Sequence, residues 1–257
     1  MVRLLNVGCG DRHDPAWVNV DLRSTGPGVM VCDVTRGLPF ADGVFDGIYH
    51  SHLLEHLPKR VAPIFLRECF RVLKEGGIAR VVVPDLECIA RLYLEYLEGA
   101  LVGDEQAQKR YEYIVIQMLD QMVRDQPGGE LLKYWRQERM PAESFVIERS
   151  GSELLNALRK LGREPDRASG CGCSASRGLG DEPKASQVAE FRLSGEIHQW
   201  MYDRYSLGVL MEAAGFDHIE VHRGDTSDIP DFNSYLLDLE ADGSVRKPDS
   251  LFVEGRK

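Results

Sequence analysis

Short apolar runs bounded by glycine, proline or aspartate recur along the first 85 residues. Such runs are typical of strands buried on both faces of a parallel sheet. Residues 59–77 instead repeat apolar side chains at intervals of three and four. This spacing predicts a crossover helix between the fourth and fifth strands, with Gly76 and Gly77 as a left-handed stop. The predicted strands are Leu4–Val7, Trp17–Val20, Val29–Cys32, Phe45–Tyr49 and Ile78–Val83.

The C-terminal part of the chain continues the alternation of helix and strand patterns. Residues 202–216 predict a helix that ends at Gly215, and residues 217–223 and 250–255 predict two further strands. A helix and an antiparallel pair at one edge complete an α/β fold with a seven-stranded sheet.

The pattern between these regions is different. Residues 86–100, 104–123 and 143–161 carry apolar side chains at helical spacing, whereas residues 163–187 are rich in Gly, Ser, Pro and charge. We therefore expect one domain made of residues 1–85 and 192–257. Residues 86–191 are then a helical insertion that serves as a lid, substrate or interface element, with a flexible loop at 163–187.

Composition narrows the choice of partner. A net charge of −10 at pH 7 and a pI near 5.2 oppose binding to nucleic acid or to an anionic membrane surface. The sequence shows neither a leader pattern nor a run that could span a bilayer, so we expect a cytoplasmic protein. Of the six cysteines, only Cys171 and Cys173 lie outside apolar or motif segments, and the nearest histidine is His198. Free thiols are favoured over a metal site.

Four polar segments follow predicted strands: residues 6–10 (NVGCG), 20–22 (VDL), 32–34 (CDV) and 46–57 (DGIYHSHLLEHL). The carboxyl ends of parallel strands meet at one edge of the sheet, where ligands bind.

Three of these segments offer a feature that suits a nucleotide. Gly8 and Gly10 let the backbone approach a ligand, and Asp21 is placed to accept hydrogen bonds from ribose hydroxyls. Asp33 could accept from an adenine amino group while Val34 packs on the ring. Singly, such a glycine pair is most often a turn, and either aspartate a helix cap or a solvated acid. Their order and spacing together favour a nucleotide site.

In this combination the residues resemble the class I S-adenosylmethionine-dependent methyltransferases, in particular the type 11 methyltransferases. The resemblance rests on the four segments above and on "RVLKEGG" (71–77); it covers residues 1–85 and resumes over 198–216. It implies a Rossmann-like sheet, S-adenosylmethionine as cofactor and transfer of its methyl group. The residues that it places at the cofactor are Gly8, Cys9, Gly10, Asp21, Leu22, Asp33, Val34 and the backbone around His50 and Ser51.

Two other functions remain open. NAD would require a fuller Gly-x-Gly-x-x-Gly pattern that opens a long helix, but position 13 is histidine and no helix pattern follows. A non-catalytic protein of the same fold could use the insertion to bind a partner. However, a site that no longer binds a cofactor has no physical need for the arrangement of Gly8, Gly10, Asp21 and Asp33.

Three helices that usually cover one face of this sheet are missing from the pattern. The connections at residues 11–17 and 23–28 are too short for crossover helices, and the sequence begins on the first strand. Strands that are apolar on both sides cannot stay exposed. We expect the helices of residues 86–161, or a second subunit in a homodimer, to pack over this face. Without a first helix, Arg12 or the insertion could help to hold the methionine carboxylate.

Candidate catalytic groups follow the fourth strand and the insertion. Histidine titrates in the range that suits deprotonation of a hydroxyl or amine, and His50, His52 and His56 all lie after the fourth strand. Our candidates for the catalytic base are His52, His56 and His198. The alternative is that Glu55 and His56 orient the loop and that one histidine is a packing residue.

The surroundings of His198 are also open to two interpretations. Trp200 and Tyr202 could line a substrate pocket, and Asp85 could contact the substrate. Alternatively, Asp203 or Ser206 caps a helix and both aromatic residues belong to the core. The acidic balance favours a small-molecule acceptor.

Overall fold

The computed structural model describes residues 2–160 and 184–257. The chain forms two compact units, one made of residues 1–90 and 198–257 and the other of residues 91–197. The sequence placed these boundaries a few residues earlier, after positions 85 and 191. Cys171 and Cys173 lie outside the described residues.

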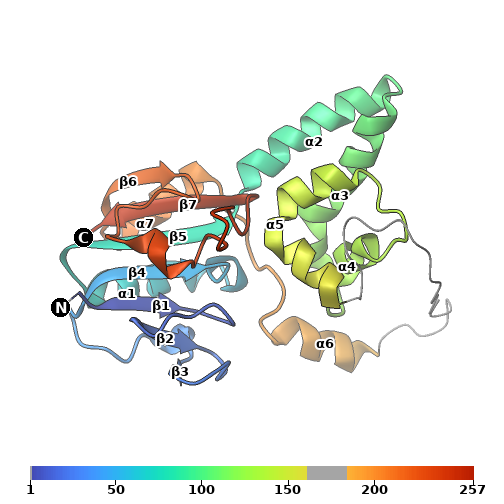
Figure 1. The fold of residues 1–257 in the computed structure, drawn as a ribbon. Coiled ribbons are helices and arrows are strands. Elements are labelled where there is room, and N and C mark those ends of the chain that lie inside the picture. The colour runs from blue at the N-terminus through green and yellow to red at the C-terminus, as the bar shows by residue number, and fades with distance from the viewer. Residues whose placement is uncertain (1, 161–183) are drawn as a thin grey trace. The chain divides into compact units, whose positions relative to one another are not determined.

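The first unit contains a seven-stranded sheet with the order β3-β2-β1-β4-β5-β7-β6 (Figure 1). Neighbouring strands from β3 to β5 are parallel, whereas β7 runs antiparallel to both β5 and β6. This arrangement confirms the predicted α/β fold with an antiparallel pair at one edge. The strands are β1 (Leu4–Val7), β2 (Trp17–Asp21), β3 (Val29–Val31), β4 (Phe45–Ser51), β5 (Leu73–Pro84), β6 (Asp217–His222) and β7 (Ser250–Arg256).

Two α-helices of this unit, α1 and α7, begin close to where the sequence predicts them. Helix α7 (Arg204–Ala214) is capped by Asp203, which accepts a hydrogen bond from the Ser206 amide, and ends at Gly215 with a φ of 111°. Helix α1 (Ala62–Val72) ends earlier than predicted because Leu73 already adopts an extended backbone. The predicted glycine stop is therefore wrong: Gly76 has a positive φ, but it lies within β5.

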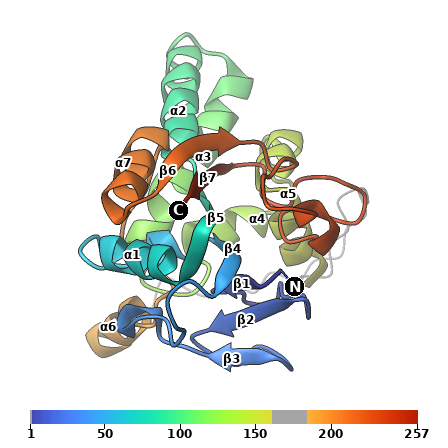
Figure 2. The ribbon, with the colours of Figure 1, turned by 90° about the vertical axis from the view of Figure 1, so that its left-hand side faces the viewer.

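The short connections are confirmed as helix-free. Residues 8–16 and 22–28, all of them described, contain no helix. Helices α1 and α7 cover one face of the sheet (Figure 2). Their apolar side chains, among them Phe65, Leu66 and Leu207, pack against strand residues such as Leu5 and Ile48 to form the main core.

A C-terminal segment covers the opposite face of the sheet. Residues 223–249 contain the 3₁₀ helix η3 (Phe232–Tyr235) and lie over this face (Figure 2). The cluster that they form with the strands contains Leu4, Trp17, Tyr49, Ile78, Val82, Ile229, Phe232, Leu237 and Phe252.

The expectation that this face needs helices of the insertion or a second subunit is therefore wrong. The segment contributes its apolar residues singly, without helical or alternating spacing, so its covering role had no periodic signal in the sequence.

Ion pairs anchor this segment to the sheet. The fully buried guanidinium of Arg80, on β5, donates to Asp238 and to Glu254, each over 2.7 Å. Asp238 also accepts a 2.6 Å hydrogen bond from the Tyr49 hydroxyl. Both carboxylates are thus satisfied inside the protein, as buried charges must be.

The second unit is helical. Three of its helices match predicted stretches; α5 is interrupted by non-helical backbone at Gly151. Two shorter helices, α4 and α6, were not predicted, and α6 shows that the expected loop is wrong over residues 185–187. None of the helices in the described ranges is long and apolar enough to cross a membrane. The helices are α2 (Leu86–Leu101), α3 (Glu105–Val123), α4 (Gly129–Trp135), α5 (Glu143–Lys160) and α6 (Ala185–Leu193).

Candidate functional site

A glycine turn follows β1 at the carboxyl edge of the sheet. Gly8 and Gly10 both have positive φ, of 67° and 50°. A Cβ atom at Gly8 would lie 3.1 Å from the Leu53 side chain, so this glycine makes room for Leu53. A Cβ atom at Gly10 would meet no neighbour within 4 Å, so the surface at Gly10 is open for a ligand to approach.

Asp21 joins the glycine turn to the end of β2. One carboxylate oxygen accepts a 2.9 Å hydrogen bond from the Gly10 amide, and the other accepts from the Arg23 amide over 3.1 Å. A carboxylate has about four acceptor positions, so Asp21 can still accept hydrogen bonds from two hydroxyls. The neighbouring Leu22 is 55% exposed and offers apolar surface beside it.

The turn also contains a buried thiol. Burial, together with the charge of Asp21, raises the pKa of Cys9 to about 11. Cys9 is therefore a neutral packing residue and not a thiolate nucleophile at neutral pH.

Asp33 follows β3 and caps the short 3₁₀ helix η1 (Val34–Arg36). Its carboxylate accepts hydrogen bonds from the amide and hydroxyl of Thr35 and lies 3.2 Å from the Arg36 guanidinium. The Thr35 hydroxyl makes the largest contribution to holding the pKa of Asp33 below its usual value, and Arg36 adds to it. This is the helix-cap role that the sequence left open. Val34 is half-buried against the main core.

The His50 side chain faces the core and not the carboxyl edge. Its ring is fully buried and packs edge-on against Phe65 at a centroid distance of 5.1 Å. Burial lowers its pKa to about 4, although the charge of Glu55 opposes this shift. Only the backbone of His50, which pairs with Val7 of β1, remains near the glycine turn.

The three predicted catalytic histidines lie around a buried carboxylate. We call His52, Glu55, His56 and His198 the histidine–glutamate cluster. His52 Nδ1 lies 3.1 Å from a carboxylate oxygen of Glu55, and the rings of His56 and His198 meet edge to face at a centroid distance of 4.8 Å. Glu55 is completely inaccessible to solvent and His198 is 5% exposed. The fold thus brings His198 to the end of β4 from a distant part of the sequence.

Backbone contacts explain this meeting. The amides of Gln199 and Trp200 both donate to the backbone carbonyl of Glu55, over 2.6 Å and 3.2 Å. They hold the residues after His198 against the turn that follows β4.

The charge of Glu55 is maintained by its neighbours. Burial alone would raise its pKa, but the hydrogen-bonding and positive charge of His52, with the charges of His198 and His56, lower the pKa to about 2. His52 has a positive φ of 51°, a strained conformation for a residue with a side chain, and its Nε2 lies 2.9 Å from the Ser250 hydroxyl. Both of its ring nitrogens are therefore engaged.

The other predicted residues have structural partners. Tyr202 belongs to the core, whereas Trp200 is 37% exposed with the Lys59 ammonium 3.9 Å from its ring centre. The Asp85 carboxylate accepts from the Cys88 amide at the start of α2. Arg12 pairs with Glu240 of the covering segment over 2.6 Å.

Sequence reasoning underestimated Glu55 and missed Ser250. The signal for Glu55 was present, because leucines flank the Glu-His pair on both sides and favour burial of the whole turn. Ser250 reaches His52 only through the pairing of β7 with β5, which a single sequence does not reveal.

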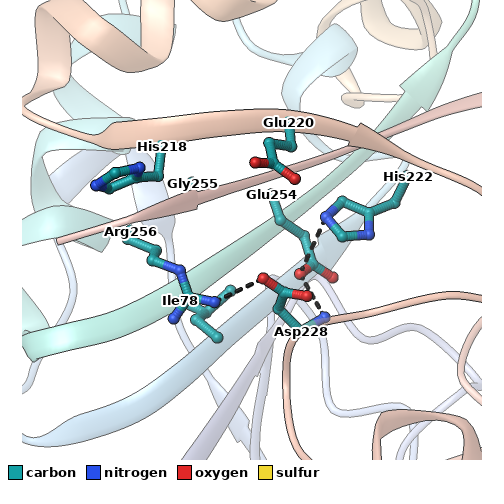
Figure 3. Close-up of a pocket in the computed structure, with 8 residues that line it drawn as sticks. All are labelled: Ile78, His218, Glu220, His222, Asp228, Glu254, Gly255 and Arg256. Atoms are coloured by element: carbon teal, nitrogen blue, oxygen red, sulfur yellow. Dashed lines mark hydrogen bonds and ion pairs between the residues drawn. The ribbon is translucent and has the colours of Figure 1, made fainter.

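A separate polar pocket of about 230 Å³ lies between β6, β7 and Asp228 (Figure 3), at the end of the sheet opposite the carboxyl ends of the parallel strands. Its lining residue Ile78 is in register with Gly47 and Leu4, at the beginnings of β4 and β1. Within it, Glu254 lies 3.6 Å from His222, and Asp228 pairs with Arg256 (Figure 3). The pocket does not adjoin the glycine turn.

Comparison with known proteins identifies the region that holds these motifs. Residues 7–81 match the model of a family described as a methyltransferase domain, which confirms the predicted resemblance over the glycine turn, Asp21, Asp33 and the turn after β4. No curated protein matches the sequence.

Solved structures with similarity to the chain include three methyltransferases. An S-adenosylmethionine-dependent methyltransferase from Archaeoglobus fulgidus is 13% identical over 100% of this chain and 86% of its own, with a TM-score of 0.41. One from Thermotoga maritima is 14% identical over 100% and 83%, with a TM-score of 0.42. The 1,6-didemethyltoxoflavin N1-methyltransferase of Burkholderia thailandensis, solved with S-adenosylhomocysteine, is 19% identical over 33% and 46%, with a TM-score of 0.30.

Proposed function

We propose that this protein is an S-adenosylmethionine-dependent methyltransferase that acts on a small-molecule acceptor. The observation that carries the proposal is the 2.9 Å hydrogen bond between the Gly10 amide and the Asp21 carboxylate. It joins the tips of two neighbouring parallel strands at the edge where nucleotides bind. The methyltransferase-domain match over residues 7–81 covers both tips.

The residues around this bond suit the cofactor. Open space at Gly10 admits the methionine part, Asp21 retains acceptor positions for the ribose hydroxyls, and exposed Leu22 offers a surface for the adenine. When bound, S-adenosylmethionine supplies a methyl group on a positively charged sulfur. The residues that we assign to this site are Gly8, Cys9, Gly10, Asp21, Leu22, Asp33, Val34 and the backbone of His50 and Ser51.

The histidine–glutamate cluster is our candidate for the acceptor side. It follows β4, the strand paired with β1, so it shares an edge of the sheet with the glycine turn. Transfer of a methyl group in line requires above all that the accepting atom be aligned. We assign contact with the acceptor to His56 and His198, where a neutral imidazole can take a proton from a hydroxyl or amine. His52, whose ring nitrogens are both engaged, positions Glu55.

A small molecule is the favoured acceptor because the net charge of −10 opposes the approach of a nucleic acid. An NAD-dependent oxidoreductase is disfavoured, because residues 8–16 contain no helix whose N-terminus could hold a pyrophosphate.

Isothermal titration calorimetry with S-adenosylmethionine and S-adenosylhomocysteine tests the cofactor site. We expect binding in wild type and at least a tenfold weaker affinity in Asp21→Ala, since hydrogen bonds to a charged group contribute about 1.5–3 kcal/mol. Asp217→Ala, at an exposed position on β6, is the matched control and should bind like wild type. Absence of binding at millimolar concentration refutes the proposal, and binding of NAD instead would assign the oxidoreductase.

A further inference from the structure

Two buried polar groups beside the turn after β4 lack hydrogen bonds that their burial calls for. Within the described residues, the Tyr202 hydroxyl has no partner and the Glu55 carboxylate has only the His52 ring nitrogen, 3.1 Å from one of its two oxygens; both residues are almost inaccessible to solvent. Burial raises the pKa of Tyr202, and the charge of Glu55 adds to this shift, so the two groups lie close enough to interact. Buried polar atoms in folded proteins are nearly always paired, and an unpaired group points to a bound water or ion.

The side chains around Glu55 have the chemistry of metal ligands. One ligand atom from each of Glu55, His56 and His198 lies within 4.8 Å of the other two. The ligand atoms of a tetrahedral ion with bonds near 2.0–2.1 Å are roughly 3.3–3.5 Å apart. Each atom therefore needs to move by less than about 1 Å to complete such a site.

We propose that Glu55, His56 and His198 bind a divalent transition-metal ion. Two imidazoles and one carboxylate suit Zn²⁺, Co²⁺ or Mn²⁺ better than Mg²⁺ or Ca²⁺, which prefer ligand sets made of oxygen alone. Three protein ligands leave at least one position open, as in catalytic metal sites.

The surroundings of Glu55 support this assignment. His52 Nδ1 lies 3.1 Å from Glu55, and the Ser250 hydroxyl lies 2.9 Å from the other ring nitrogen. Partners of this kind orient a ligating carboxylate. The strained backbone of His52, which brings its ring to this place, is also typical of functional sites.

A second group of possible ligands, His222, Asp228 and Glu254, fits a metal less well. Glu254 is already bound by the Arg80 guanidinium over 2.7 Å. Asp228 is bound by Arg256 over 2.6 Å (Figure 3). These cations neutralise the carboxylates and repel a further positive ion. This second group therefore provides a control made of the same residue types.

The metal site deepens the proposed function, and only its use in methyl transfer rests on that function. The oxygen or nitrogen of an acceptor can bind the ion at its open position, which lowers the pKa of that group so that its proton passes to water. This replaces proton transfer to His56 and His198, whose ring nitrogens are then occupied as ligands. In this arrangement both histidines contact the acceptor through the ion.

Metal binding is measured on the full chain without cofactor, so that its failure is distinct from failure to bind S-adenosylmethionine. Metal-free protein is titrated with Co²⁺ and Zn²⁺, and the visible absorption of bound Co²⁺ reports its ligands. We expect one ion per chain and Co²⁺ bands typical of four or five nitrogen and oxygen ligands. Glu55→Gln and His198→Gln should each weaken binding by more than about a hundredfold, since loss of even an outer partner costs 10–100-fold. His222→Gln should bind like wild type.

Three outcomes would overturn the proposal: no stoichiometric binding to wild-type protein, binding of Mg²⁺ alone, or affinity that falls in His222→Gln but not in His198→Gln. Circular dichroism identifies any variant that fails to fold. If Glu55→Gln is such a variant, the Co²⁺ spectrum of wild type and the affinity of His198→Gln still decide the question.

Discussion

The Arg80 guanidinium donates to the Asp238 carboxylate over 2.7 Å, and both side chains are buried between the sheet and the segment that covers it. Arg80 lies in β5, whereas Asp238 belongs to residues 223–249. This ion pair therefore attaches the covering segment to the sheet. The aromatic rings of Phe232 and Phe252 stack on the same guanidinium, with ring centres 4.8 Å and 5.2 Å from it.

Removal of one partner should be strongly destabilising. Asp238→Ala leaves Arg80 with one fewer carboxylate and the Tyr49 hydroxyl without its acceptor. We expect a loss of about 3–5 kcal/mol in the free energy of unfolding, the usual cost of breaking a buried pair. Urea denaturation followed by circular dichroism measures it. Asp217→Ala, which removes an exposed carboxylate, should leave the midpoint unchanged; equal midpoints for the two variants would show that the pair does not hold the segment.

The covering segment also depends on aromatic packing. The rings of Trp17 and Phe232 meet edge to face at 6.0 Å, and Trp17 is 4% exposed. Phe232→Ala should cost about 3–5 kcal/mol and release the segment from the sheet. Limited proteolysis should then cut within residues 223–249 faster than in wild type. Tyr205→Ala, at a residue 79% exposed on α7, is the control and should be cut at the wild-type rate.

Burial of His50 predicts acid sensitivity. Its pKa is about 4 in the folded protein, below the ordinary value of 6.5, so the unfolded chain takes up this proton at a higher pH than the native state. Stability from the neutral ring is therefore complete above pH 6.5 and lost as the pH falls from 6.5 towards 4, by up to about 3 kcal/mol.

His50→Phe should remove this component, because phenylalanine keeps the edge-on contact with Phe65 and carries no proton. The measurement is the unfolding free energy at several pH values between 4 and 7. His218→Gln, at an exposed position, should keep the wild-type pH dependence. An identical slope for wild type and His50→Phe would contradict the assignment.

A feature of this structure could be predicted from the sequence when the residues that determine it lie close together along the chain. The strand tips could be predicted because their determinants lie within a few residues, and for the same reason the Asp203 cap was one of the two alternatives that the sequence left open. The covering segment could not be predicted, because Ile229 and Phe232 find their partners on β1 and β2, more than two hundred positions away. Likewise, the three histidines were singled out, but their meeting around Glu55 depends on backbone hydrogen bonds from Gln199 and Trp200.

The two glycines of the turn after β1 should respond differently to alanine, and this contrast separates ligand approach from packing. Both have positive φ, so each variant carries about 1–2 kcal/mol of backbone strain. At Gly8 the new methyl group also meets Leu53 at 3.1 Å, whereas at Gly10 it enters open space. Gly8→Ala should therefore lower the thermal midpoint more than Gly10→Ala does.

The order is reversed for ligand affinity. The Gly10 methyl group occupies the surface that the cofactor approaches in the proposed site, so Gly10→Ala should bind S-adenosylhomocysteine at least about tenfold more weakly, beyond what its stability loss explains. Calorimetry at a temperature where both variants are folded measures the affinity, and thermal unfolding measures the strain. If Gly10→Ala bound as tightly as wild type, the cofactor would not pass over this turn, because the added methyl group would lie in the path of the cofactor.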